Sequence, residues 1–437
     1  MKNIIVIFSI FIFSNAAFGQ DFLSFNDCLN LAVKNNLFLE NAAISEKIAV
    51  YDLKTKKGKL LPSINGNVEN KYSWGRDIDP TTNTFIDEKF KSYAGNIEAT
   101  YSLFSGFINL KNIKSAKQEV EINKANIQRI KNDITVDLAQ LYINILYLQE
   151  TIIVNREQIK ASEKQLEVAE LKFKSGVIAE SEVFKIQSQK ATEELILATN
   201  ENQLAVNYID LKQLINIPLE REIELIKPNL LLDENAHSLE NQYSITKKAI
   251  EIHPSFLMSE LIENKAKTAI SIARSYRMPS LNLKFTYGSK YSDKNSMGFN
   301  DQVETNLLYG IKLNMTIPIF NQFETSYRIK QSKLAYKQSK LNTQIEQNRL
   351  SRVVLQAIND AKAAKKKQES SSIAFEFAQK SFDSDQLKYD LGKININELN
   401  FTKTNYTNAQ AELIRAKYEL LFNNALINFY LGEDFTL

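Results

Sequence analysis

The residue types that carry most enzyme chemistry are scarce in this sequence. It has two histidines, His237 and His253, and neither has a second ligand at the spacing that metal sites use. The phosphate-binding glycine loop, the Gly-x-Ser-x-Gly elbow and the His-Glu-x-x-His helix are absent from the sequence. Cys28 is the only cysteine, so no disulfide forms within the chain, and we expect it to be a small buried residue. We therefore predict no catalytic site, metal or cofactor.

Two glutamates occupy matching positions and have two interpretations. Glu182 and Glu398 each lie six residues after a glycine, Gly176 and Gly392 respectively. Each carboxylate could simply begin a helix, where the macrodipole favours a negative charge. Alternatively, copies from several subunits could surround a narrow opening, where a ring of like charges selects cations or holds the opening shut.

The two glycines belong to a fourteen-residue stretch that occurs twice, 216 residues apart. Leu171 to Phe184 reads LKFKSGVIAESEVF and Leu387 to Asn400 reads LKYDLGKININELN. In each copy a single glycine separates two long runs of helix-forming, apolar-periodic sequence. The glycine can adopt the positive φ that a sharp reversal requires. The pattern therefore predicts two helical hairpins with tips at Gly176 and Gly392.

The segments before the tips are duplicated as well. Helical sequence from Asn26 to Leu60, interrupted at Asn35-Asn36, ends at Pro62; helical sequence from 249 to 278, interrupted at His253-Pro254, ends at Pro279. After each proline the apolar period changes to two, which predicts β-hairpins at 63–104 and 280–320. We expect the last strand to run from Val303 to Ile317.

Each predicted β-hairpin leads into a very long helix. The stretches 107–174 and 322–389 contain no proline, and near-heptad apolar spacing predicts that they supercoil with neighbouring helices. Shorter helices, 180–214 and 396–430, return from the tips. We therefore predict a first repeat at 20–216, a connector at 217–243 and a second repeat at 244–437.

The amino-terminal sequence is typical of a secretory signal peptide, or leader. Residues 1–19 contain one basic residue, an apolar run from Ile4 to Phe13, and the ending Ala17-Phe18-Gly19. We expect cleavage before Gln20. No second apolar run reaches the ~20 residues of a spanning helix. The formal net charge of +3 is close to balance, which argues against a nucleic-acid partner.

Four strands with one apolar face pose a problem of unpaired edges. In lipid an open edge is not tolerated, so the strands must either lie in a soluble core or close by association of several chains. Two copies would give eight strands, and three would give twelve, enough to leave a lumen. Aromatic residues near the strand ends, and Glu98, Lys284, Glu304 and Lys312 on the polar face, favour a membrane barrel. A soluble sandwich capped by a coiled coil remains the alternative.

The ordered duplication resembles the TolC family of outer-membrane efflux proteins. The resemblance rests on the doubled order of helix, proline, β-hairpin, long helix and tip, and on the strand exits Leu103–Gly106 and Ile319–Gln322. It implies a mainly α fold with a β-barrel section, in which a homotrimer forms a twelve-stranded outer-membrane barrel continued by an α-helical tunnel through the periplasm.

The functional implication of the resemblance is a passive exit duct in a Gram-negative outer membrane, serving efflux or type I secretion. Its implied partners are a periplasmic adaptor protein and an inner-membrane pump of the RND, ABC or MFS type. Two rivals remain open: a secreted coiled-coil scaffold or adhesin, and a periplasmic enzyme.

The resemblance also implies roles for residues near the tips. Gly176 and Gly392 match the family's tip glycines, which face the adaptor, and Tyr389 matches the tyrosine of the second tip. Glu398 aligns with an aspartate of the acidic ring at the periplasmic entrance, and Glu182 with the acid of the first tip.

The sequence departs from the family pattern at two entrance positions. Ile394 replaces an arginine that helps to lock the closed entrance, and Phe401 replaces a residue of a second acidic ring. We therefore expect closure to depend more on apolar packing.

Overall fold

The computed structural model of the protein describes residues 21–228 and 242–437. The predicted leader, and residues 229–241 of the predicted connector, lie outside the described residues. The described chain forms two compact units: one contains residues 21–40, 129–253 (without 229–241) and 350–437, and the other contains 41–128 and 254–349. The two longest helices run through both units. Among the described residues, the helices contain no apolar stretch of the length that a membrane-spanning helix needs.

The helices repeat along the chain at a nearly constant offset. In the first half they are α1 (Phe25–Asn35), α2 (Leu37–Gly58), α3 (Ile108–Lys174) and α4 (Glu180–Leu214). In the second half they are α5 (Gln242–Ile252), α6 (Pro254–Ser275), α8 (Glu324–Asp390) and α9 (Ile396–Tyr430). The bounds of α5 and α6 follow those of α1 and α2 by 217 residues, and those of α8 and α9 follow α3 and α4 by 216. The predicted long helices and return helices are confirmed.

Local side-chain chemistry explains the break between α1 and α2. Ser24 and Asp27 form a capping box at the start of α1, which satisfies backbone N–H groups that have no partner within the helix. Asn36 has an extended backbone and ends α1, and its side-chain oxygen accepts the N–H of Phe38 at 2.9 Å, in the first turn of α2. Its amide also donates to the carbonyl of Leu214 at 3.1 Å, which ties the break to the end of α4.

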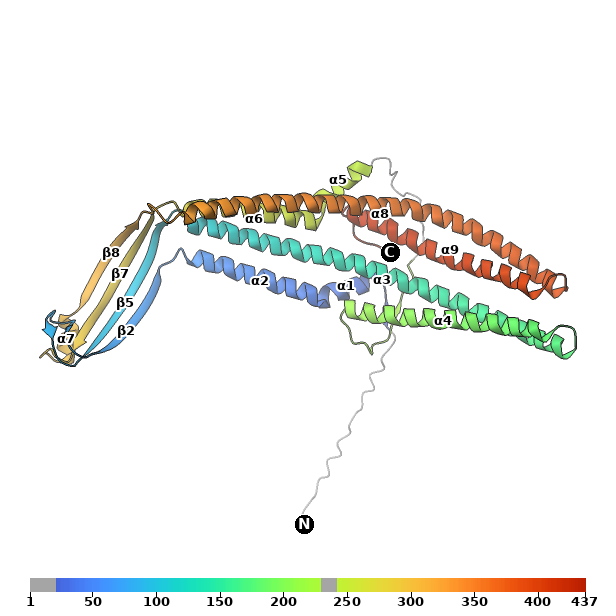
Figure 1. The fold of residues 1–437 in the computed structure, drawn as a ribbon, viewed down its shortest axis with the longest axis horizontal. Helices are drawn as coiled ribbons and strands as arrows, with labels where there is room; N and C mark the ends of the chain where they lie inside the picture. Colours follow the sequence, from blue (N-terminus) through green and yellow to red (C-terminus); the bar gives the residue numbers. More distant parts are fainter. Residues whose placement is uncertain (1–20, 229–241) are drawn as a thin grey trace, which may run out of the picture. The chain divides into compact units, whose positions relative to one another are not determined.

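Four long strands form one antiparallel sheet in the order β2 (Ser63–Ser73), β5 (Phe90–Ser105), β7 (Ser280–Ser292) and β8 (Leu308–Thr316), as Figure 1 shows. The register places Ile97 opposite Tyr287, and Glu98 opposite Thr286 on the other face, so the predicted alternation is confirmed. On the polar face Lys284 forms an ion pair with Glu98 at 2.6 Å. Strands β2 and β8 are the two outer strands of this sheet.

The prediction that the last strand includes Val303 is wrong. Val303 lies in a short helix, α7 (Phe299–Thr305), and β8 begins only at Leu308. The buried Gln302 amide bonds both the N–H and the carbonyl of Ser292 at 2.9 Å, so a side chain takes the place of a partner strand there. The Phe299 ring packs on Tyr291 with centroids 5.1 Å apart. Val303 lies four residues from Phe299, the spacing of one helix face, which a two-residue alternation cannot reveal.

Small strands complete the fold. β1 (Asp21–Leu23) pairs in parallel with β6 (Ile223–Leu225), and β3 (Asp77–Ile78) pairs with β4 (Phe85–Ile86) in the loop after β2. The Tyr142 hydroxyl lies 3.2 Å from the carbonyl of Leu23 and 2.5 Å from that of Ile226, which anchors the β1–β6 pair to α3.

Candidate functional site at the hairpin tips

The reversals at both tips use the same backbone geometry. Gly176 has a φ of 75° and Gly392 a φ of 69°. The N–H of Gly176 bonds the carbonyl of Phe173 at 2.8 Å, and the N–H of Gly392 bonds that of Tyr389 at 2.9 Å. In each copy the following N–H bonds the carbonyl five residues back, which makes the pair of bonds that commonly ends a helix at glycine. The predicted hairpins, α3 with α4 and α8 with α9, are confirmed (Figure 1).

The second tip is capped by a side chain and the first is not. Asn395 precedes α9, and its side-chain oxygen accepts the N–H of Asn397 at 2.9 Å and that of Glu398 at 3.1 Å. Its amide donates to a carboxylate oxygen of Glu398 at 2.7 Å. Ala179, at the equivalent place before α4, makes no such bond. The side chain of Glu398 is therefore held in one orientation beside the helix start.

Tyr389 brings the two tips into contact. Its ring is half-buried, and the ammonium of Lys172, from the other hairpin, lies 5.5 Å from the ring centroid. Burial raises the pKa of the Tyr389 hydroxyl, and the nearby charges of Glu182 and Asp390 raise that pKa further. Glu182, in the first turn of α4, is half-buried, whereas Glu398, in the first turn of α9, is exposed.

An apolar cluster joins the hairpins just behind the tips. Its buried members are Ala169, Val183, Ile186, Ile396 and Leu399, with Leu166, Ile178, Phe382, Tyr389 and Ile394 packed against them. Ile394, at the position where the family has an arginine, thus contributes to apolar packing. Phe401, the second departure from the family pattern, is 68% exposed. Within one chain, apolar packing therefore joins the two hairpins behind the tips; that closure of the entrance depends on such packing stays a prediction.

A buried polar group behind the apolar cluster was not predicted from the sequence. Lys403 on α9 bonds Glu193 on α4 at 2.8 Å, and both side chains are almost completely buried. The sequence contained a signal, because Lys403 continues the apolar spacing of Ile396 and Leu399, and Glu193 continues that of Val183 and Ile186. A charged residue within an apolar stripe on each of two helices indicates a buried ion pair.

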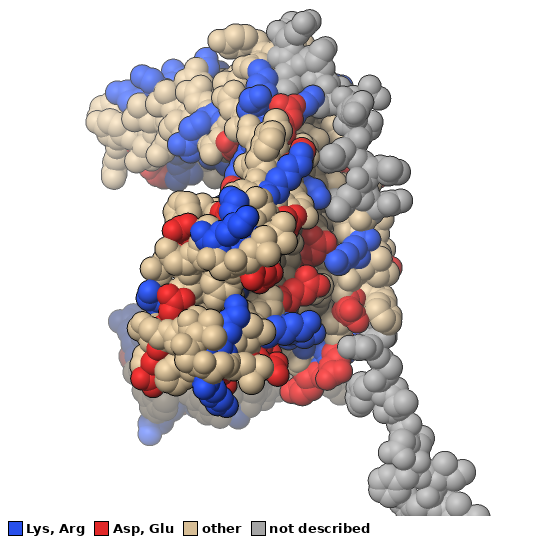
Figure 2. All heavy atoms as spheres, turned by 90° about the vertical axis from the view of Figure 1, so that its right-hand side faces the viewer, with Lys and Arg blue, Asp and Glu red and all other residues tan. Residues whose placement is uncertain are grey.

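The tip end of the molecule carries charges of both signs. Figure 2 shows Lys and Arg side chains interspersed with Asp and Glu and with uncharged surface. In the part of the chain that the structure describes, no group of three or more His, Cys, Asp or Glu side chains could hold a metal ion.

The family model for outer membrane efflux proteins matches residues 28–216 and 245–433. The chain belongs to the outer membrane efflux protein family. Among its relatives, the outer membrane protein TolC of Vibrio cholerae is 23% identical over 315 residues, which is 70% of this chain and 67% of the relative. TolC of Escherichia coli is 22% identical over 409 residues, 91% of this chain and 80% of the relative.

Solved structures of outer membrane efflux proteins share the fold. The CmeC outer membrane channel of Campylobacter jejuni superposes with a TM-score of 0.81 at 17% identity, covering 94% of this chain and 87% of CmeC. CusC superposes with a TM-score of 0.80 at 15% identity, covering 97% of this chain and 96% of CusC. The fold therefore combines the long α-helical hairpins and the β section of these channels.

Membership of the outer membrane efflux protein family, together with this fold, makes the chain an outer-membrane exit duct of efflux systems in Gram-negative bacteria. The family consists of channel proteins, and the secreted coiled-coil scaffold is not favoured.

Proposed function

We propose that three copies of this chain form a passive duct, without catalysis, that carries cargo from a periplasmic adaptor and an inner-membrane pump of the RND, ABC or MFS type to the exterior. The observation that carries the proposal is the sheet with two outer strands, β2 and β8, in a protein of the outer membrane. Each outer strand has one row of backbone groups without a partner in the sheet, and in lipid each unpaired group costs several kcal/mol.

A second copy can satisfy these groups. If β8 of one copy pairs with β2 of the next, three copies close a twelve-stranded ring, and twelve strands leave a lumen. The apolar face of the sheet, with Phe285, Tyr287 and Ile97 each more than 40% exposed in the single chain, would then meet the hydrocarbon of the outer membrane. The polar face, with the Glu98–Lys284 pair, would meet water.

Exposed apolar residues on the adjoining helices support the same pairing of copies. Helix α2, which leads into β2, exposes Ile44, Ile48 and Tyr51 by 48%, 64% and 65%. Helix α8, which follows β8, exposes Leu334, Leu341 and Ile345 by 67%, 50% and 64%. The steps between these residues, four and three on α2 and seven and four on α8, are those of a helix-packing stripe. A neighbouring copy that paired its strand with β8 would bring its α2 stripe toward the α8 stripe.

In the proposed duct the hairpin tips form the periplasmic entrance. Gly176 and Gly392 would face the adaptor, and Tyr389, Glu182 and Glu398 would surround the opening. Glu182 belongs to the first hairpin and lies near enough to Tyr389 of the second for its charge to raise the pKa of the Tyr389 hydroxyl. The half-buried Tyr389 also contributes to the apolar packing between the hairpins. The repeats at 20–216 and 244–437 would each supply one hairpin, and the segment 217–243 would connect the two repeats in the sequence.

The experiment that tests the proposal combines fractionation and electrical recording. The protein is expressed in a Gram-negative host, and the outer membrane is separated and extracted with detergent. We expect a single oligomer of three copies that inserts into planar lipid bilayers and conducts ions. A water-soluble monomer, or an oligomer that never conducts, would contradict the proposed function.

A further inference from the structure

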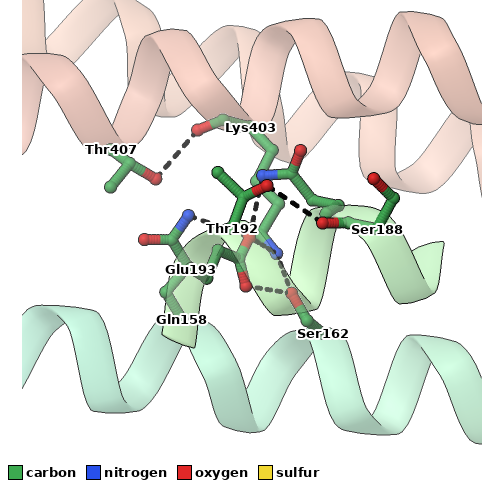
Figure 3. Close-up of polar contacts among 8 residues, drawn as sticks. Gln158, Ser162, Ser188, Thr192, Glu193, Lys403 and Thr407 are labelled. Atoms are coloured by element: carbon green, nitrogen blue, oxygen red, sulfur yellow. Dashed lines mark hydrogen bonds and ion pairs between the residues drawn. The ribbon is translucent and has the colours of Figure 1, made fainter. Parts of the chain in front are cut away.

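A buried group of polar side chains links three helices at one level of the hairpins. Its members, called here the Lys403 cluster, are Gln158 and Ser162 on α3, Gln189 and Glu193 on α4, and Lys403 on α9 (Figure 3). The residues Ser162, Glu193 and Lys403 are only 1%, 3% and 5% exposed. Lys403 is the member that comes from the second hairpin, so it connects that hairpin to the first.

Every oxygen of the carboxylate at the centre of the cluster is satisfied. Lys403 donates to Oε1 of Glu193 at 2.8 Å, and Gln158 and Gln189 donate to the same oxygen at 3.0 Å and 3.1 Å. The hydroxyl of Ser162 donates to Oε2 at 2.5 Å and accepts a bond from the Lys403 ammonium. The geometry is thus complete only when α9 lies at one height against α3 and α4.

Burial makes this pair different from the other ion pairs of the same hairpins. Arg156 on α3 bonds Glu201 on α4 at 2.7 Å, but its side chain is 60% exposed and both partners belong to the first hairpin. An exposed pair of that kind contributes about 0–1 kcal/mol to stability. Separation of Lys403 from Glu193 would leave two buried charges without their opposite partner, and removing one partner of a buried pair is strongly destabilising.

The position of the cluster divides the interface between the hairpins into two regions. Lys403 lies eleven residues after Gly392 and Glu193 seventeen after Gly176, so the cluster is roughly 15–25 Å along the helices from the tips. Between the cluster and the tips the buried contacts include the apolar ones of Val183, Ile186, Ile396 and Leu399. Apolar contacts are non-directional and tolerate sliding, whereas the cluster requires one register.

We propose that Lys403 is a positioning residue of the entrance: the buried Lys403–Glu193 pair pins α9 to the first hairpin, and the hairpins separate only on the tip side of this pin when the entrance opens. The inference rests on the proposed duct function. It adds the level along the hairpins at which their separation stops. Loss of the pin would let the separation extend further along the hairpins, so the resting entrance would conduct more.

The test measures conductance of the assembled trimer in planar bilayers. We expect Glu193→Gln, and separately Lys403→Met, to raise the mean resting conductance, through an open-state population that is roughly tenfold larger or more. The exchanged variant Glu193→Lys/Lys403→Glu restores an attractive pair, and the amides of Gln158 and Gln189 can rotate to accept from the new lysine. We expect this variant to return toward the wild-type conductance. Arg156→Met, which breaks the exposed pair within one hairpin, is the control and should conduct as the wild type does.

Amide hydrogen exchange distinguishes a local loosening of the hairpins on the tip side of the cluster from a general loss of stability. We expect Glu193→Gln to accelerate exchange on the tip side of the cluster, at 177–192 and 396–402, and to leave 204–214 near the wild-type rate. Acceleration over all these segments alike would contradict the inference.

The double variant Glu193→Leu/Lys403→Met removes both charges without leaving one unpaired, so it provides a test even if the single variants fail to assemble. It should assemble and conduct more than the wild type. Variants that assemble and conduct at the wild-type level would contradict the inferred role of the Lys403–Glu193 pair, but not the proposed duct function. A wild-type protein that never conducts would instead refute the proposed function itself.

Discussion

Gly106 and Gln322 occupy the same position in the two repeats, 216 residues apart, and both have a positive φ, 61° and 54°. Each follows a strand exit and precedes a phenylalanine whose φ is 63°. In both copies that phenylalanine stacks edge-on against the one three residues earlier, Phe104 with Phe107 at 5.2 Å and Phe320 with Phe323 at 5.4 Å. The turn from sheet to helix is therefore one structure built twice, with glycine at the left-handed position in one copy and glutamine in the other.

This comparison predicts that substitutions at the two turns change the stability of the protein in opposite directions. Gly106→Ala should destabilise the protein, because the new Cβ would lie 2.7 Å from the backbone oxygen of Ser275 and 2.6 Å from Cβ of Met278, and because φ is positive. Gln322→Gly should stabilise it by about 1 kcal/mol, since a residue with a Cβ adopts the left-handed region at a cost of roughly 1–2 kcal/mol. Thermal unfolding in detergent measures both; equal shifts of the two midpoints in the same direction would contradict the prediction.

The tips provide a second prediction, on docking. A Cβ added at Gly176 or Gly392 would meet nothing within 4 Å, so the strain in Gly176→Val and Gly392→Val is local, about 1–2 kcal/mol per site from the positive φ. We expect normal trimers in the outer membrane, but weaker binding of the adaptor and slower export. Gly58→Val, which also enters open space but at a residue without positive φ, is the control. Intact trimers of both tip variants that export at the wild-type rate would refute a docking role for the tips.

The acidic residues at the entrance predict an effect on ion permeation. Three copies of Glu398 would surround the opening in the trimer, and a ring of carboxylates favours cations. Glu398→Gln should lower the cation selectivity and weaken block by divalent cations, and Glu182→Gln should act in the same direction. Glu194→Gln, which changes an exposed residue of α4 further from the tip, should not. Unchanged reversal potentials in bilayers for both entrance variants would contradict the acidic ring. The remaining interpretation would be that each carboxylate stabilises the start of its helix through the macrodipole.

Burial of the Cys28 thiol predicts a contribution to folding stability that depends on pH. Burial, followed by the neighbouring charge of Asp27, raises the pKa of its thiol to about 12. A thiol in an unfolded chain titrates near pH 8.5, so between about pH 8.5 and pH 12 the unfolded state loses a proton that the folded state keeps. The thiol therefore contributes full stability below pH 8.5, and this contribution falls by up to about 1.4 kcal/mol per pH unit as the pH rises toward 12.

The measurement is maleimide labelling of the folded protein between pH 7 and pH 9, followed by mass spectrometry. Cys28 should stay unmodified until denaturant is added, while a cysteine introduced by Val177→Cys at the exposed first tip reacts rapidly. Labelling of Cys28 at the rate of the exposed cysteine would show that its thiol is not buried.

The elements predicted best from the sequence are those whose signal is repeated over many residues. Helices α3, α4, α8 and α9 begin and end within two residues of the prediction, because long apolar periods and single glycines mark them clearly. The break at Asn36 is also predictable, since its side chain acts on the local backbone. At the tips, Gly176 and Gly392 are identifiable because the reversal requires a positive φ.

The features that the sequence does not reveal depend on contacts between distant segments. The alternation of apolar and polar residues predicts a strand at Val303. In the structure this segment is a helix, and its buried Gln302 amide bonds to the backbone of Ser292. The apolar spacing around Lys403 and Glu193 indicates that each charge is buried, but not which residue it pairs with, since 210 residues separate the two and their pairing exists only after α9 packs on α4. The meeting of Lys172 with Tyr389 has the same origin.

In the proposed duct, one chain supplies a third of a closed wall, with β8 of each copy paired to β2 of the next. The most direct measurement is cryo-electron microscopy of the protein purified from outer membranes into lipid nanodiscs. We expect three copies around one axis, a twelve-stranded ring whose apolar face meets lipid, and six helical hairpins that continue the ring to a narrowed entrance. A sheet folded into the dry interior of a single chain, or a ring closed by any other number of copies, would contradict it.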